Sequence, residues 1–285
     1  MTMVVDEGDF LKIWLDYWRR YLPDECLHVI CHGENPELES LARGVRFENI
    51  ARNAPYPEME NDRWKMLADK VSALTRDGFT VVYTDVDEIL IADPRHTGSV
   101  VDKLMRVDVP VAHTLGLEVI HRTDKAPEPI SLDMPILRQR QYFRTTSFYS
   151  KPCIVTAPVR WGRGGHFADA EKLYFIRGLY TVHLRFFEMN QFRERARARR
   201  AMTDAPENLK ALHHRRWRES DEGIEDVIAE LHAMKCPRIR SMFTLRLLWR
   251  IWRTRKKVPN EDGLYVYALC TGDLQRFPRR FLNLI

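Results

Sequence analysis

The chain has 285 residues, of which 45% are hydrophobic and 30% charged, and a formal net charge of +5; this composition excludes a wholly disordered chain and a collagen-like repeat. It contains no run of 18 apolar residues, which excludes a membrane-spanning helix, and its first residues lack the basic segment that opens a secretory signal. The five cysteines are odd in number and form no CxxC pair, which argues against a disulfide framework or a zinc ribbon and favours a reducing compartment.

The first third of the chain alternates between predicted strands and helices. Apolar runs predict strands at residues 3–5, 27–31, 45–50 and 79–83, and apolar residues at helical spacing predict helices that begin at Asp9 and at Asn61. The run from Phe79 to Tyr83 is nearly continuous, as in strands that are buried on both faces of a parallel sheet. This alternation predicts a doubly wound, Rossmann-like α/β sheet.

The rest of the chain changes in pattern and in charge. Strands are expected at residues 107–113, 115–120, 154–156 and 179–184, with a loop at 123–135, and helices at 192–202, 223–234 and 239–257. Residues 186–285 carry 21 Lys and Arg against 13 Asp and Glu, while residues 1–185 carry 24 against 27. We therefore predict two domains, 1–185 and a basic, mainly helical region 186–285 that meets an anionic surface. Solvated helix faces are the alternative explanation of this charge.

The most informative segment is the acidic turn that follows the fourth predicted strand. Asp85 and Asp87 are two residues apart, and Glu88 comes directly after them. In open α/β sheets ligands bind beyond the carboxyl ends of the strands. Adjacent carboxylates repel one another unless a cation neutralises them, and Mg²⁺ or Mn²⁺ bridging to a diphosphate has the right ligand chemistry. A solvated acidic turn is the alternative.

Three patches of the sequence, which together cover about residues 3–185 in the expected order, resemble the GT-A glycosyltransferases. Residues 4–17 (VVDEGDFLKIWLDY) are similar to an opening motif x-N-E-x-x-F-L-x-x-W-x-x-Y, and residues 83–88 (YTDVDE) are similar to a D-x-D-E-F block in which Ile89 replaces Phe. Residues 150–155 (SKPCIV), followed by Gly165 and His166, look like a K-x-I-V…H block. The likeness is to the family-2-like and family-92-like group that carries a DxDE motif.

This resemblance implies a GT-A fold and transfer of a sugar from a nucleotide-diphosphate donor to the hydroxyl of a glycan or lipid-linked acceptor, as in polysaccharide biosynthesis, with inversion at the sugar. It implies Mn²⁺ or Mg²⁺ as the cofactor, held by Asp85, Asp87 and His166. The residues that it places near the donor are Asp6, Glu7, Glu34, Asp85 and Lys151. Many relatives carry D-N-G-S where this chain has His32 to Asn35, so the base and the sugar of the donor stay open.

An inverting transferase needs a carboxylate that takes the proton from the acceptor hydroxyl. Glu118 lies among apolar residues, where burial would raise its pKa, although a strand edge that faces solvent is the alternative. Glu88 either orients the acceptor or supports the turn, and Glu128 and Asp133 are further candidates. His183 is a rival to His166, but a lone histidine on an apolar strand is more often a core residue.

Near the C-terminus, residues 239–257 predict a basic amphipathic helix. Arg246, Arg250, Arg253 and Lys257 share one face, while Leu245, Leu248, Trp249 and Trp252 line the opposite one. Such a helix either lies on an anionic membrane or packs its apolar face on the core. A second basic run, Arg193 to Arg200, has no interleaved aromatic residues and no nucleic-acid-binding motif beside it, which argues against nucleic acid as a partner.

The sequence therefore predicts a metal-dependent glycosyltransferase in the cytoplasm or on the inner face of a membrane. The principal alternative is a non-catalytic GT-A-like protein that binds a carbohydrate or an anionic surface. A hydrolase or a nucleotidyltransferase with an acidic metal site would suit the turn but not residues 4–17.

Overall fold

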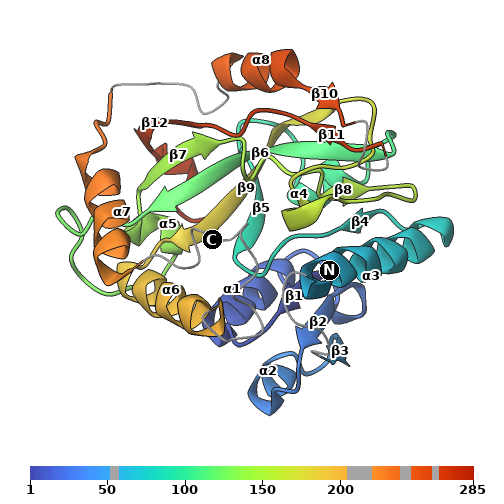
Figure 1. Cartoon of the computed structure of the whole chain (residues 1–285), viewed down its shortest axis with the longest axis horizontal. Helices are drawn as coiled ribbons and strands as arrows, with labels where there is room; N and C mark the ends of the chain where they lie inside the picture. The colour runs from blue at the N-terminus through green and yellow to red at the C-terminus, as the bar shows by residue number, and fades with distance from the viewer. Residues whose placement is uncertain (52–57, 204–219, 238–244, 259–262) are drawn as a thin grey trace.

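The computed structural model describes residues 1–51, 58–203, 220–237, 245–258 and 263–285, which form a mixed α/β structure (Figure 1). The α-helices are α1 (Gly8–Trp18), α2 (Pro36–Leu41), α3 (Glu58–Arg76), α4 (Val100–Leu104), α5 (Ile136–Gln139), α6 (Met189–Thr203), α7 (Asp221–Ala233) and α8 (Leu245–Thr254). The strands are β1 (Thr2–Val4), β2 (His28–His32), β3 (Arg46–Ile50), β4 (Val81–Val82), β5 (Glu88–Ala92), β6 (Val111–Ile120), β7 (Tyr142–Thr146), β8 (Ile154–Val155), β9 (Phe175–Phe186), β10 (Lys256–Lys257), β11 (Tyr265–Val266) and β12 (Thr271–Arg276). Short 3₁₀ helices cover Asp24–Cys26, Arg163–Gly165 and Arg279–Phe281.

The first strands form the predicted parallel arrangement. β1 pairs in parallel with β2, and β2 with β3. The amino group of Met1 donates to the Val82 carbonyl at 2.8 Å, and the Thr84 amide donates to the Met1 carbonyl at 3.3 Å, which is the pattern of a parallel pair. The three-stranded sheet has the order β1-β2-β3, and these two bonds place β4, a strand of the larger sheet, beside β1 in the order β3-β2-β1-β4. The carboxyl ends of all four strands therefore lie at one edge.

The remaining strands form a larger mixed sheet. Its main order is β12-β7-β6-β8-β4, and β9 pairs in parallel with β6 and antiparallel with β5. β5 begins at Glu88, so the acidic turn joins the end of β4 to a strand that lies against β9. Trp14 of α1 donates its indole N–H to the Thr84 hydroxyl at 3.1 Å, which ties this helix to the turn.

Three predicted strands differ from the structure in their bounds. Residues 107–113 and 115–120 are not separate: β6 runs without a break from Val111 to Ile120, because the polar Thr114 is buried and its hydroxyl bonds to that of Thr181. Phe79 was expected in a buried strand but is 60% exposed, since α3 ends at Arg76 and β4 begins only at Val81. β5 was not predicted.

The C-terminal hundred residues contain the expected helices α6, α7 and α8 and also the strands β10, β11 and β12. β12 pairs antiparallel with β7 at the edge of the large sheet. One hydrophobic core cluster includes Trp14 and Leu117 together with Phe277, Phe281 and Ile285. The last part of the chain therefore shares its core with the first, and the division at residue 185 stays a prediction.

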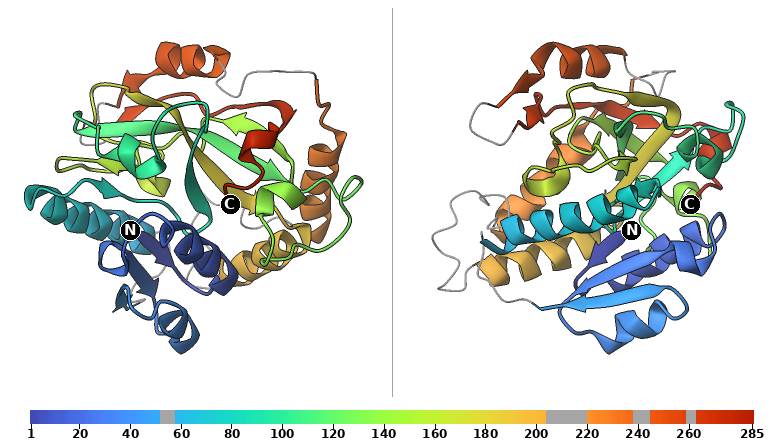
Figure 2. Two further views of the ribbon diagram at one scale, coloured as in Figure 1. Left: turned by 180° about the vertical axis from the view of Figure 1, so that it is seen from behind. Right: turned by 90° about the vertical axis from the view of Figure 1, so that its right-hand side faces the viewer.

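All five cysteines are free thiols. Within the described residues, no helix has both the length and the apolar character needed to cross a membrane. Figure 2 shows α8 on the outer surface, at the opposite end of the molecule from the β1–β2–β3 sheet.

Candidate functional site

The strand register lines up four charged residues across the large sheet. Glu88 of β5 is opposite His183 of β9, His183 is opposite Glu118 of β6, and Glu118 is opposite Arg144 of β7. Because directly paired residues point to the same face of a sheet, their side chains meet in one row. Glu118 receives the Nε–H of Arg144 at 2.6 Å, and its other oxygen lies 3.5 Å from Nδ1 of His183.

Lys151 holds the acidic turn to the loop before β8. Its ammonium lies 2.6 Å from Oδ2 of Asp85 and 2.7 Å from Oε1 of Glu88. The other oxygen of Asp85 accepts from Arg63 of α3 at 3.2 Å. Burial opposes ionisation of Asp85, but Lys151 and Arg63 outweigh it and lower the pKa of this carboxyl. Lys151 is itself buried, yet the two carboxylates raise its pKa well above the ordinary value.

Asp87 points toward β9 and α6 rather than toward Lys151. Both terminal nitrogens of Arg195 donate to its Oδ2 at 3.1 Å, and Nε2 of His183 lies 3.6 Å from the same atom. Burial would raise the pKa of Asp87, but His183 and Arg195 hold it well below its ordinary value. Arg195 also lies 3.4 Å from Oε1 of Glu7.

The contacts above define a charge cluster of five carboxylates (Glu7, Asp85, Asp87, Glu88, Glu118) and five cationic groups (Arg63, Arg144, Lys151, His183, Arg195). Half of these residues are buried, with Glu88 1% and His183 4% exposed, and the other half are partly exposed. Burial, together with Arg195 and Arg185, also lowers the pKa of the neighbouring Arg199 to about 10.

The two predicted catalytic carboxylates differ in their environments. Burial raises the pKa of Glu88 to about 7, against the opposing effect of Lys151. Glu118 is buried rather than facing solvent, so the strand-edge alternative was wrong. Its pKa is nevertheless lowered and not raised as expected, because His183 and Arg144 outweigh burial. Glu88 can therefore exchange a proton near neutral pH, whereas Glu118 stays ionised.

His183 belongs to this cluster, although the sequence favoured an ordinary core role. Its ring stacks on that of Tyr149 with centroids 3.5 Å apart and an interplanar angle of 17°. Burial would lower its pKa, but Asp87 and Glu118 raise it above the ordinary value, which favours the protonated form of the imidazole. The sequence signal was present only as a histidine on an apolar strand.

His166, the predicted metal ligand, lies at the end of a glycine-rich turn. Gly165 has a φ of +63° and lies so close to Trp64 of α3 that a Cβ there would overlap the indole. Nδ1 of His166 contacts the Phe148 carbonyl at 2.6 Å, which leaves Nε2 as the nitrogen for a ligand. Burial, with Lys151, lowers its pKa to about 4, so the ring is neutral, the form that binds metals.

Among the described residues, no three His, Cys, Asp or Glu side chains come together as a metal-holding group. The donor set still fits a divalent ion that is bound through one carboxylate and substrate phosphates, as is typical of Mg²⁺. Arg195 and His183 both use Oδ2 of Asp87, so Oδ1 is the oxygen that suits a metal. Asp85 is the poorer ligand, since Lys151 and Arg63 use both of its oxygens.

The other residues that were predicted to lie near the nucleotide-sugar donor come directly after the parallel strands, at the same edge of the sheet. Asp6 and Glu7 come after β1 and Glu34 after β2, so the topology places them on the side of the acidic turn. Asp6 lies 3.5 Å from the side-chain amide of Asn35, and Glu7 reaches the cluster through Arg195. Glu34 is exposed.

Sequence reasoning missed the cations of the cluster. Arg195 lies 108 residues from Asp87 in the chain, and its only signal was the basic run Arg193 to Arg200, which was considered for nucleic-acid binding alone. Arg63 is an ordinary polar residue of the helix predicted from Asn61, and Arg144 belongs to no recognisable motif, so neither arginine has a sequence signal of its own. Only the strand register and the packing of α3 and α6 bring these side chains to the carboxylates.

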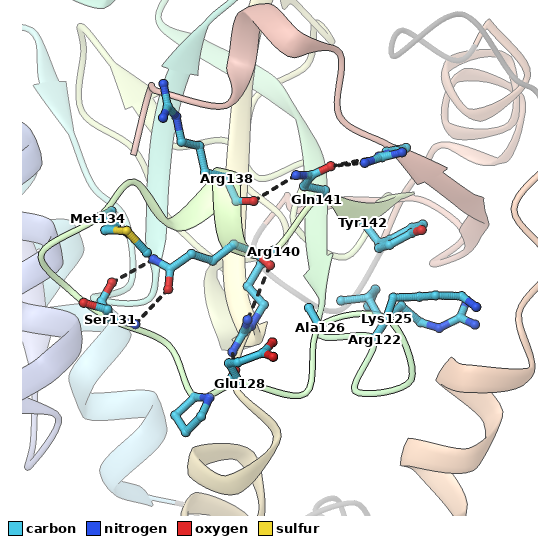
Figure 3. A pocket seen from close by; sticks show the side chains of 14 residues that line it. Arg122, Lys125, Ala126, Glu128, Ser131, Met134, Arg138, Arg140, Gln141 and Tyr142 are labelled. Atoms are coloured by element: carbon cyan, nitrogen blue, oxygen red, sulfur yellow. Dashed lines mark hydrogen bonds between the residues drawn. The ribbon is translucent and has the colours of Figure 1, made fainter.

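A cavity of about 450 Å³ lies further along the same strands (Figure 3). Ile120 and Tyr142, which line it, come two residues beyond Glu118 and Arg144 along the paired strands. Its charged lining residues are mostly basic: Arg122, Lys125, Arg138, Arg140 and Arg276, with Glu128. Arg140 is buried and pairs with Glu188 at 2.8 Å, so part of this charge is structural.

Comparisons of the chain with models of protein families, with curated proteins and with solved structures found no match.

Proposed function

We propose that the chain is a glycosyltransferase of the GT-A type, which transfers a sugar from a nucleotide-diphosphate donor to the hydroxyl of a glycan or lipid-linked acceptor. The observation that carries this proposal is the buried charge cluster at the end of β4, next to the carboxyl edge of the order β3-β2-β1-β4. Burying so many charges costs several kcal/mol for each ion, and such arrangements concentrate at functional sites.

The cations of the cluster have the chemistry that departure of a nucleoside diphosphate requires. Negative charge develops on the leaving phosphate, and preorganised donors in a site that excludes water stabilise it. Lys151 carries three such N–H groups and Arg195 carries five, and the two side chains lie on two sides of the acidic turn. A bound diphosphate would compete with Asp85 and Asp87 for them, so these carboxylates hold the cations in position before the donor arrives.

Of the two candidate bases, Glu88 has the better-matched pKa. A general base works best when its pKa lies near the operating pH, and that of Glu88 is about 7. Glu118, held by Arg144, keeps His183 protonated beside Asp87. Glu88 is therefore proposed to take the acceptor proton, and Glu118 to position the imidazolium.

A divalent ion, Mn²⁺ or Mg²⁺, is proposed as the cofactor, with Asp87 and His166 as the residues that would hold it. When bound, it would supply further positive charge at the diphosphate.

A second candidate is a GT-A-like protein that binds a sugar nucleotide or an anionic surface without turnover. It is favoured by one observation: every carboxylate of the acidic turn already has a partner within the chain. Binding without release of a nucleoside diphosphate would support it.

The decisive experiment is a thermal-shift screen of nucleotide sugars with and without Mn²⁺ or Mg²⁺, followed by measurement of nucleoside-diphosphate release. A ligand of the native state contributes ~2.7 kcal/mol at a hundredfold excess over its Kd, which is readily seen as a higher Tm. We expect one donor to shift the Tm and to be turned over.

In Asp87→Asn we expect turnover to fall by about 100-fold or more, because Arg195 and His183 lose the carboxylate that positions them. A loss of this size is typical when one hydrogen-bond donor to the transition state is removed. Asp77→Asn removes an exposed carboxylate just after α3 and is the matched control. Wild-type turnover in Asp87→Asn, with its fold intact by circular dichroism, would refute the assignment.

A further inference from the structure

Helix α8 presents its apolar residues outward, in the opposite direction to the one expected for a packed amphipathic helix. Leu247 and Ile251 are buried against the core, whereas Leu245, Trp249 and Trp252 are 76%, 55% and 71% exposed. At 100° per residue these three side chains lie roughly 120° to 180° around the helix from the midpoint of the buried pair. Of the four apolar residues expected on one face, Leu248 is partly buried against the core, as in the packed alternative, whereas Leu245, Trp249 and Trp252 face solvent. Residues 239–244 of the predicted helix lie outside the described residues.

The exposed apolar ridge is flanked by positive charge. Arg246, Arg250 and Arg253 are exposed along one side, and Lys256 and Lys257 follow at the end of the helix. Residues 245–257 contain no Asp or Glu. The Arg253 guanidinium lies 4.9 Å from the centre of the Trp249 ring, so the charged and aromatic groups form one continuous surface.

These observations together indicate which kind of partner binds the exposed face of α8. Exposed Trp and Leu side chains with basic residues beside them are the composition of a helix that lies in the plane of a membrane interface. In a symmetric contact between two copies of the chain, the same patch meets itself. The arginines of α8 would then face arginines, with no acid on the helix to compensate. A polyanion without apolar groups would contact the arginines of α8 but would leave the Leu245 side chain exposed to water.

We infer that α8 docks the protein on an anionic lipid surface, with Leu245, Trp249 and Trp252 inserted among the acyl chains and the basic residues at the headgroups. This inference goes beyond the proposed function and does not depend on the transfer reaction. It accounts for a helix that covers the core with only two buried residues and turns its largest apolar side chains to solvent.

The test uses the full chain and sedimentation with vesicles. We expect binding to vesicles of phosphatidylcholine with 30% phosphatidylglycerol, weak binding to pure phosphatidylcholine, and a decrease with added salt. Each basic residue near an anionic surface strengthens binding about fivefold, so Arg246/Arg250/Arg253→Gln is expected to weaken it at least tenfold. Trp249/Trp252→Ser is expected to abolish it.

Two controls match these variants. Arg43/Arg76/Arg106→Gln removes three exposed arginines elsewhere and changes the net charge equally, and Phe79/Met105→Ser removes two exposed apolar side chains away from α8. Both are expected to bind like the wild type. The inference is overturned if the wild type stays in the supernatant with anionic vesicles or if the α8 variants bind as their controls do. It is also overturned if Trp249/Trp252→Ser converts a dimer to a monomer, or if heparin binds the wild type and this variant equally while vesicles do not bind.

Discussion

His183 lies between Asp87 and Glu118, and these two carboxylates raise its pKa above 6.5. A group whose pKa is raised on folding contributes stability that is fully present below its unfolded pKa and is lost as the pH rises through its folded pKa. We therefore expect the Tm difference between wild type and His183→Gln to be larger at pH 6 than at pH 9.

Thermal melts of both proteins across this range measure the effect. Glu88 also has a raised pKa, about 7, and so acts in the same direction, but it is present in both proteins and largely cancels in the difference. A Tm difference that grows with pH would contradict the assignment of a protonated His183.

Lys151 is 6% exposed and faces two carboxylates, Asp85 and Glu88, at 2.6 and 2.7 Å. Removal of one partner of a buried ion pair leaves an uncompensated charge, so Lys151→Met is expected to lower the free energy of unfolding by about 3 to 5 kcal/mol. Lys70→Met breaks a pair with Glu48 whose side chains are 28% and 33% exposed, and it is expected to cost no more than about 1 kcal/mol. Urea denaturation of both variants measures the two losses in the free energy of unfolding. Equal losses would show that the ion pairs of Lys151 are no stronger than an ion pair at the surface.

At the scale of elements, the turn Arg163–Gly165 positions His166 against α3. Gly165 has a φ of +63°, and a Cβ there would overlap Trp64, whereas Gly78, with a φ of +87°, has no atom within 4 Å of such a Cβ. The left-handed backbone costs an alanine roughly 1–2 kcal/mol at either position. Overpacking adds about 1–3 kcal/mol at Gly165 alone.

Gly165→Ala is therefore expected to be the less stable of the two variants, as measured by urea denaturation. If the His166 turn moves with it, Gly165→Ala also loses donor turnover, while Gly78→Ala retains it. Equal stability of the two variants would mean that the turn is not packed on Trp64.

The elements that the sequence predicted correctly are those whose signals are local. The helix from Asp9, the strand at residues 27–31 and the acidic turn each depend on neighbouring residues, and all are present. The partners of the turn could not be predicted, because Arg195 and His183 reach Asp87 only through the pairing of β5 with β9 and the packing of α6. For α8 the sequence offers apolar residues on two faces, and only tertiary packing decides that Leu247 and Ile251 face inward.

At the scale of the whole molecule, the first and last parts of the chain share one core. Phe281 is fully buried, and the centroid of its ring lies 6.1 Å from that of Tyr180. It belongs to the same hydrophobic cluster as Trp14 and Leu117. β12 also completes the sheet edge at β7. A boundary near residue 185 would therefore cut through packed side chains rather than through a linker, so the two parts are expected to unfold together.

Phe281→Ala tests this coupling from the C-terminal side. The lost burial and the cavity are expected to cost about 3–5 kcal/mol. Because the core is shared, we expect a single thermal transition, with far-UV and near-UV circular dichroism coinciding, and the substitution should move the whole transition to lower temperature. If the chain instead consists of two independent domains, Phe281→Ala will shift only one of two transitions. The part that contains α1 and the parallel strands will then melt as in the wild type.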